Sequence, residues 1–180
     1  MLWAYNPRNV NTDFYPRPVK LEDVQNVQGL YQRSRRYFDI IAADIPNQFD
    51  VSRELESALG DARRYLELYF KDNVSEPFGY LDLKFDYPQS GDATINLLLI
   101  AEDAQSRGFG SKIVENLEAR LNDGSFAPRR VRRLLAGIYG DNPGAVKFWE
   151  RLGYHFAVDA RPVLAWYAKE LVPANLEISR

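Results

Sequence analysis

The chain has 180 residues, a formal net charge of −2 at pH 7 and 46% hydrophobic residues. This length fits one domain, and the charge provides no basic field to attract nucleic acid. There is no cysteine and a single histidine, His155, so disulfides, thiolate chemistry and a metal site built on such ligands are excluded. No apolar stretch approaches the roughly 20 residues of a membrane span. Residues 1–8 lack the apolar run of a signal peptide, which favours a cytoplasmic protein.

The first part of the chain predicts an arm, an edge strand and three helices. Residues 1–13 show little periodicity and form the expected arm. Residues 14–20 predict a strand, and its two prolines confine that strand to the edge of a sheet because proline donates no ladder hydrogen bond. Apolar residues at helical spacing predict helices over residues 21–31, 37–43 and 51–60. Asp50 is the expected cap of the third helix, which Gly60 closes.

The middle of the chain changes to a period of two, which predicts three strands. Leucine, isoleucine and phenylalanine alternate with polar or aromatic residues around Leu68, Leu83 and Leu97. Turn sequences at residues 72–73 and 88–91 join the segments. We therefore expect an antiparallel meander.

The last part of the chain predicts a return to helices, with strands between and after them. Phe109, Ile113, Leu117 and Leu121 make one apolar stripe on a helix over residues 109–121. A strand over 131–139, a helix over 143–152 and two more strands within 154–171 follow. One of these last strands has Val163, Ala165 and Tyr167 on one side. The expected product is a mixed α/β domain with a short tail at residues 172–180.

The turn before the helix at 109–121 has a chemical use. Gly108 and Gly110 remove side chains and let backbone N–H groups point at one place. That place is a helix N-terminus, where free N–H groups and the helix dipole favour an anion. The expected ligand is a phosphate or pyrophosphate. The order Ser111-Lys112 excludes a Walker A loop, and Ile113 stands where a dinucleotide fingerprint needs a third glycine.

Two segments resemble the GNAT superfamily of acyl-CoA N-acyltransferases. Gln105-x-x-Gly108-x-Gly110 is similar to motif A of that family. Residues 141–154, with Asn-x-x-Ala, Phe-Trp and Leu-Gly-Tyr in order, are similar to motif B, and one helix and one strand separate the two motifs. The resemblance covers residues 14–171. It implies a GNAT acyltransferase domain with a mixed, mostly antiparallel central sheet flanked by helices.

The resemblance also implies a coenzyme A site. In the family, the strand before the loop binds the pantetheine arm through its backbone, which requires an edge splayed away from the strand at 131–139. By position, the residues that would bind the cofactor are Leu98, Leu99, Ile100, Gln105, Ser106, Arg107, Gly108, Phe109, Gly110, Ser111, Asn142 and Phe148. For three of these, a structural role stays open. Arg107 can be a solvated side chain, Asn142 a helix cap, and Phe148 a core residue.

Two catalytic positions depart from the family pattern. Thr94 aligns with the usual glutamate base and Trp149 with the usual tyrosine acid, and neither can serve in that role. Strand parity instead predicts that six residues line an acidic, aromatic cleft for a cationic amine, with a solvated sheet face as the alternative. They are Glu67, Tyr69, Tyr80, Asp82, Thr94 and Asn96. Asp82 is the candidate base and Tyr139 the candidate acid.

The predicted function is an N-acetyltransferase that moves an acetyl group from acetyl-CoA directly to an amine acceptor. The absence of cysteine and of any evident Ser/His pair argues against a covalent enzyme intermediate. The alternative is a non-catalytic acyl-CoA-binding module, which Thr94 and Trp149 suggest, and a nucleotide-binding protein with a different phosphate loop is a third possibility. Neither a nucleic acid nor a membrane is an expected partner, no metal is expected, and a homodimer stays open.

Overall fold

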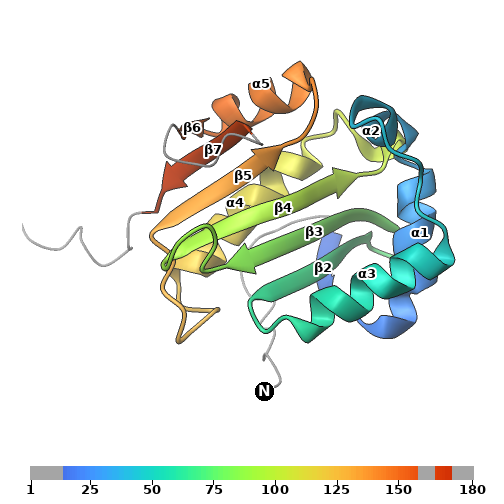
Figure 1. Ribbon diagram of the computed structural model, residues 1–180, viewed down its shortest axis with the longest axis horizontal. Helices are drawn as coiled ribbons and strands as arrows, with labels where there is room; N and C mark the ends of the chain where they lie inside the picture. Colours follow the sequence, from blue (N-terminus) through green and yellow to red (C-terminus); the bar gives the residue numbers. More distant parts are fainter. Residues whose placement is uncertain (1–13, 158–164, 172–180) are drawn as a thin grey trace, which may run out of the picture.

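The computed structural model of the chain describes residues 14–157 and 165–171, in which helices flank a central sheet (Figure 1). The strands of these residues form one seven-stranded sheet in the order β1-β2-β3-β4-β5-β7-β6. Every neighbouring pair is antiparallel except β4 and β5, which are parallel. The predicted mixed, mostly antiparallel sheet is therefore confirmed. The predicted arm, the predicted tail and Val163 lie outside the described residues.

The strands follow the predicted order, with the meander in the middle of the sheet. Their bounds are Phe14–Pro18 (β1), Arg64–Lys71 (β2), Pro77–Phe85 (β3), Asp92–Ile100 (β4), Arg133–Ile138 (β5), His155–Phe156 (β6) and Ala165–Glu170 (β7). The proline-containing strand β1 pairs with β2 at one edge of the sheet, as expected. Within the described residues, no helix is long and apolar enough to pass through a lipid bilayer.

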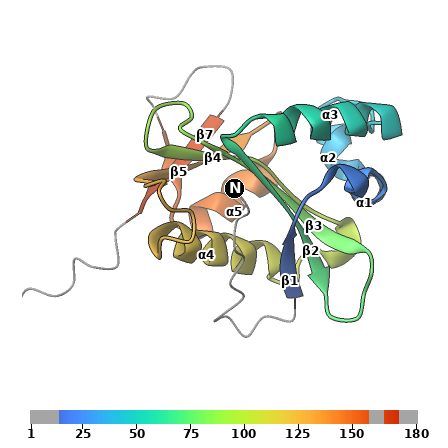
Figure 2. The ribbon, with the colours of Figure 1, turned by 90° about the horizontal axis from the view of Figure 1, so that it is seen from below.

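The helices form two layers, one on each face of the sheet. Figure 2 shows α1, α2 and α3 on one face and α4 and α5 on the other. Their bounds are Val24–Gln32 (α1), Arg35–Ile40 (α2), Gln48–Gly60 (α3), Phe109–Asn122 (α4) and Pro143–Arg151 (α5). Single 3-10 turns at Leu21–Asp23 and Glu102–Ala104 precede α1 and follow β4.

The predicted start of α3 is wrong by one turn. The side chain of Asn47 accepts hydrogen bonds from the N–H groups of Phe49 and Asp50, and Asp50 accepts one from the N–H of Asn47. Asn47 is therefore the cap, and Asp50 is the third residue of the helix. Both residue types can cap a helix, and the earlier start satisfies two N–H groups reciprocally.

The predicted grouping of polar residues on one sheet face is also wrong. Glu67 pairs with Leu81, whereas Asp82 pairs with Leu66. Residues directly opposite each other share a face, so Glu67 and Asp82 point to opposite sides of the sheet. Glu67 and Tyr69 face α4, while Tyr80, Asp82, Thr94 and Asn96 lie on the face of α1 to α3.

A solvated sheet face is excluded as well. The side chains of Glu67, Tyr80 and Thr94 are 0% exposed, and Asp82 is 4% exposed. The alternation of β2 and β3 reflects two buried faces, each covered by helices, rather than one core face and one face in water. Parity alone could not reveal which residues of neighbouring strands share a face, because the register was unknown.

Candidate active site

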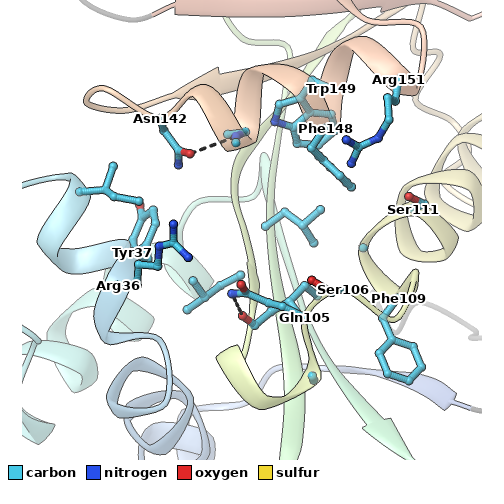
Figure 3. A pocket seen from close by; sticks show the side chains of 18 of the residues that line it. Arg36, Tyr37, Gln105, Ser106, Phe109, Ser111, Asn142, Phe148, Trp149 and Arg151 are labelled. Carbon is cyan, nitrogen blue, oxygen red and sulfur yellow. Dashed lines mark hydrogen bonds between the residues drawn. The ribbon is translucent and has the colours of Figure 1, made fainter.

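A cavity of about 660 Å³ lies where β4 and β5 separate, beside the N-termini of α4 and α5 (Figure 3). The two strands pair only from Asp92 with Arg133 to Ile95 with Ala136. β4 continues to Ile100, so its last residues have no strand partner on that side among the described residues. Leu98, Leu99 and Ile100 line the cavity. The predicted splay, which leaves backbone groups available to a ligand, is confirmed.

The two glycines of the loop have different physical roles. Gly108 caps α4 with φ at 79°, in the left-handed region, and a Cβ there would meet no atom within 4 Å. Gly110 lies against α5, because a Cβ there would approach the ring of Phe148 to 3.3 Å. Gly108 therefore serves the backbone conformation of the turn, and Gly110 serves close packing of the two helices.

The N-terminus of α4 presents free backbone donors to the cavity. The first hydrogen bond of this helix runs from the N–H of Lys112 to the carbonyl of Gly108, at 3.1 Å. The N–H groups of residues 109–111 have no acceptor within the helix. Gly108, Phe109, Gly110 and Ser111 all line the cavity. These groups, together with the helix dipole, make an anion cradle that phosphate oxygens fit.

Every residue predicted to bind the cofactor lines the cavity except Arg107, which is exposed outside it. Several of their side chains already have structural partners. The Nε2 of Gln105 donates to the carbonyl of Ile100 at 2.8 Å, which ties the loop to the end of β4. The ring of Phe109 packs against Phe14 and Phe78, so only its backbone is available to a ligand.

Asn142 caps α5, as the structural alternative predicted. Its Oδ1 accepts a hydrogen bond from the N–H of Ala145 at 3.0 Å, and Pro143 begins the helix. The amide nitrogen of Asn142 points to the cavity side (Figure 3). Capping uses the oxygen alone, so the same residue can still donate to a ligand.

The cavity has walls that sequence reasoning missed. Arg36, Tyr37 and Ile40 of α2 line one side, and Arg151 of α5 lines the other (Figure 3). The N–H of Arg36 donates to Glu102 at 2.7 Å, which fixes the start of α2 beside the loop after β4. This contact joins residues that lie far apart in the chain, and no local pattern could have revealed it.

The two positions that depart from the family pattern are both structural. Thr94 is 0% exposed, and its hydroxyl donates to the carbonyl of Tyr87 at 2.6 Å. Trp149 is 5% exposed, with its indole against the rings of Phe148 and Tyr154, and it also lines the cavity. Neither side chain is placed as a base or an acid.

The candidate base, Asp82, is held by other protein groups. Its carboxylate accepts two hydrogen bonds from the guanidinium of Arg64, and the amide of Asn96 lies 3.5 Å away. Within the described residues, Asp82 does not line the cavity. The candidate acid, Tyr139, is 41% exposed, and partial burial raises the pKa of its hydroxyl. Their catalytic roles stay predictions.

A second carboxylate lies near Asp82 and was not anticipated. Glu54 of α3 is half-buried and accepts a hydrogen bond from the hydroxyl of Tyr31 at 2.8 Å. Burial raises the pKa of Glu54 and Asp82 adds to that rise, while the hydrogen bond from Tyr31 and the charge of Arg64 oppose it. Tyr37, a wall of the cavity, is also an electrostatic neighbour of Glu54.

Glu67 belongs to a separate, closed network on the α4 face. Its carboxylate accepts hydrogen bonds from Tyr65, Tyr69 and Arg120. These bonds occupy both oxygens and leave Glu67 without access to the cavity. Within the described residues there is no group of three His, Cys, Asp or Glu side chains that could hold a metal ion.

Comparison with known proteins agrees with this geometry. Residues 26–154 match the acetyltransferase (GNAT) family. An acetyltransferase from Thermus thermophilus has a similar structure at 39% sequence identity and a TM-score of 0.80, over 89% of this chain and 98% of that one. No curated protein matches the sequence.

More distant structures share the fold alone. Spermidine N-acetyltransferase from Vibrio cholerae, in complex with CoA and spermine, is 16% identical with a TM-score of 0.69, over 91% of this chain and 98% of that one. The ribosomal-protein-S18-alanine N-acetyltransferase of Escherichia coli is 15% identical with a TM-score of 0.64, over 93% and 99%. With its family match, open β4 edge and glycine cradle, this chain belongs to the acetyltransferase (GNAT) family.

Proposed function

We propose that this protein transfers an acetyl group from acetyl-CoA directly to the amino group of an acceptor. One observation carries the proposal: the unpaired edge of β4 and the N-terminus of α4 open into the same cavity. The first suits an extended chain of amides, and the second suits a pyrophosphate. Acyl-CoA contains both groups: the pantetheine arm with its amides follows the thioester, and the pyrophosphate follows the arm.

The proposed placement of the cofactor follows from these groups. The backbone of Leu98, Leu99 and Ile100 would bond the pantetheine amides, and the amide nitrogen of Asn142 would donate from the opposite wall. The free N–H groups of residues 109–111 would bind the pyrophosphate. Arg36 and Arg151 add positive charge at the walls, where phosphate oxygens can pair with a guanidinium.

The proposed reaction is a direct attack of a neutral amine on the thioester carbonyl. A bond forms between nitrogen and carbon, the bond from carbon to sulfur breaks, and the thiolate leaves. A base that removes the amine proton and an acid that protonates the thiolate assist such a step. Tyr139 is the proposed acid because of its position: it directly follows β5 and stands three residues before Asn142 of the cavity wall. Asp82 remains a candidate base.

The proposed acceptor is defined by its reacting amino group. The Vibrio cholerae enzyme that shares the fold acts on spermidine, and the Escherichia coli enzyme acts on a protein alanine. These acceptors differ greatly in size, so the fold leaves the class of amine open. What they share is an amino group that is cationic in water, and that group is the part of the acceptor we propose here.

A non-catalytic acyl-CoA-binding protein is the second candidate. The buried, hydrogen-bonded Thr94 and the packed Trp149 favour it, because these positions lack the usual base and acid. Turnover separates the two functions. Purified protein is incubated with acetyl-CoA and, in turn, spermidine, an alanine-terminated peptide, kanamycin and tyramine, and free thiol is measured. Amine-dependent release of thiol supports the transferase, whereas CoA binding without any release supports the binding protein.

The cofactor site has its own test in the substitution Gly108→Asp. This change places a side chain and a negative charge in the cradle and strains a backbone with φ at 79°, so calorimetry should detect no CoA binding. Gly124→Asp is the matched control, because Gly124 follows the other end of α4 with φ at 84° and also has open space around it. CoA affinity that is equal in both variants would refute this placement of the pyrophosphate.

A further inference from the structure

Next to the two carboxylates, a buried tyrosine hydroxyl has no hydrogen-bond partner in the part of the chain that the structure describes. Tyr80 is 0% exposed, and its hydroxyl is the one buried side-chain polar atom that finds no partner among the described residues. Glu54 and Asp82 are electrostatic neighbours of this hydroxyl, yet Glu54 is bonded to Tyr31 and Asp82 to Arg64. Buried polar groups are nearly always satisfied, so an unpaired one at this place points to a partner from outside the chain.

We name this group the carboxylate–tyrosine cluster: Tyr31, Glu54, Arg64, Tyr80 and Asp82. It draws on three different elements, α1, α3 and the β2–β3 hairpin. The ring of Tyr31 stands edge-on to that of Tyr80, with centroids 6.3 Å apart. These contacts hold the cluster together on the face of the sheet that α1 to α3 cover.

The cluster lies beside the end of β4 whose other edge is open. Asp82 pairs with Leu97 and Tyr80 with Leu99, so only one strand spacing, about 4.8 Å, separates their backbones from that of β4. The amide of Asn96, where β4 leaves β5, approaches Asp82 at 3.5 Å. Tyr37 of α2 links the cluster to the cavity, because it lines the cavity and is an electrostatic neighbour of Glu54.

The charges of the cluster suit a cation. When both carboxylates are ionised, Arg64 balances only one of them. The groups that act on Glu54 are Tyr31 from α1, Arg64 from β2 and Asp82 from β3, while Tyr37 and Tyr80 have it as a neighbour. Arg64 is the one cation among these, and its guanidinium is already bonded to Asp82. A positive ligand beside Glu54 would supply the missing charge, and tyrosine rings add cation–π attraction.

We propose that the carboxylate–tyrosine cluster binds the cationic amino group of the acceptor, with Glu54 as the base that takes its proton and the Tyr80 hydroxyl as a hydrogen-bond partner. The inference rests on the proposed acetyl transfer and names the acceptor end of that site. One N–H bond of the ammonium breaks, its electron pair stays on nitrogen, and the proton moves to a carboxylate oxygen of Glu54. A neutral amine remains, ready to attack. Asp82 is then a positioning residue, which acts by fixing Arg64.

Two substitutions test the proposal with the amine that wild type acetylates best in the four-compound panel. Glu54→Gln should lower kcat/KM by roughly 10²–10⁴-fold, the range for losing a general base. Tyr80→Phe should lower it by roughly tenfold to a hundredfold, as for a lost hydrogen bond to a charged group. CoA affinity should stay within about twofold of wild type in both, since neither side chain lines the cavity. Glu56→Gln, an exposed change on the same helix, is the matched control.

Stability and pH separate this role from a structural one. Tyr80→Phe deletes an unpaired buried hydroxyl, so the melting temperature should be unchanged or higher while turnover falls. Burial raises the pKa of Glu54 above its ordinary 4.5, and only the ionised form accepts a proton. Wild-type kcat/KM should therefore rise with pH through that raised pKa, and Glu54→Gln should lose this limb of the profile.

The outcomes separate a failure of the proposed acceptor site from a failure of the proposed acetyl transfer. Suppose that wild type acetylates an amine, but kcat/KM of Glu54→Gln equals that of Glu56→Gln within twofold and still rises with pH as in wild type. The cluster is then not the acceptor site, while the proposed acetyl transfer is supported. A less stable Tyr80→Phe with normal kinetics would likewise overturn the role of the hydroxyl. If wild type binds CoA yet releases thiol with none of the four amines, the proposed function fails and this inference fails with it.

Discussion

The sheet has buried carboxylates on both faces, and the hydrogen bonding around them differs between the two faces. On the α4 face, Glu67 is 0% exposed and both its oxygens are bonded, to Tyr65, Tyr69 and Arg120. On the opposite face, the carboxylate–tyrosine cluster keeps a hydroxyl that is unpaired among the described residues and a half-buried Glu54 with a raised pKa. A complete set of hydrogen bonds rigidifies a structure, whereas an unsatisfied buried group calls for an explanation, which the proposed acceptor amine would supply.

The closed network joins α4 to the sheet. Arg120 lies on α4, the helix whose N-terminus forms the anion cradle. Burial opposes the charge of Arg120, but the adjacent Glu67 outweighs it and raises the pKa of the guanidinium. The ion pair therefore fastens the last turn of α4 to β2, at the end of the helix opposite the anion cradle.

The largest expected effect is on stability and comes from removing Arg120 from this network. Arg120→Met should lower the free energy of unfolding by about 3–5 kcal/mol, because Glu67 would remain buried with its charge uncompensated. Denaturation in urea measures this value, and the exposed Arg53→Met on α3 is the control. CoA affinity of the folded variant should persist. A loss below about 1 kcal/mol would mean that the network is not the scaffold that its geometry indicates.

A smaller effect is expected at Asp82, and it tests which carboxylate is the base. Asp82→Asn should lower turnover by about tenfold, since it weakens a charge-assisted pair with Arg64 rather than removing the proton acceptor. Steady-state kinetics of Asp82→Asn and Glu54→Gln, measured side by side, decide which carboxylate is the base. If Asp82→Asn instead loses roughly 10²–10⁴-fold and Glu54→Gln loses little, Asp82 is the base.

The smallest effect concerns how the carboxylate–tyrosine cluster changes the stability of the protein as pH changes. The pKa of Glu54 is raised in the folded protein by burial, so the native state binds this proton more tightly than the unfolded chain does. Its contribution to stability is fully present below the ordinary value of 4.5 and is lost as pH rises through the raised pKa. Glu54→Gln avoids that loss, so its melting temperature should exceed that of wild type at pH 7 and converge with it at pH 4. A variant that is less stable at pH 7 would contradict this account.

The cofactor side of the site could be predicted from the sequence because its determinants are local. Gly108 and Gly110 stand two residues apart, and a left-handed turn followed by a helix start is a property of the chain segment itself. The order of strands and helices follows similarly from period and turn residues. Where two caps competed, as at Asn47 and Asp50, the local pattern erred by one turn.

The acceptor side could not be predicted because it depends on register and on helix docking. Leu66 pairs with Asp82, and a bulge between Asp82 and Leu83 shifts the pairing with β4. Parity along each strand carries no information about these offsets when both faces are buried. Glu54 reaches the cluster only because α3 packs over the sheet.

By itself the sequence determined the order of strands and helices and the loop that can hold a pyrophosphate. These features depend on consecutive residues, so local conformational preference specifies them, whereas the open edge of β4 was implied by the family resemblance and arises from its limited pairing with β5. Only the tertiary structure decided that Glu67 joins a closed hydrogen-bonded network while Glu54, Tyr80 and Asp82 gather on the opposite face of the sheet. That division depends on side chains from distant segments, and burial and pairing arise only when those segments pack together.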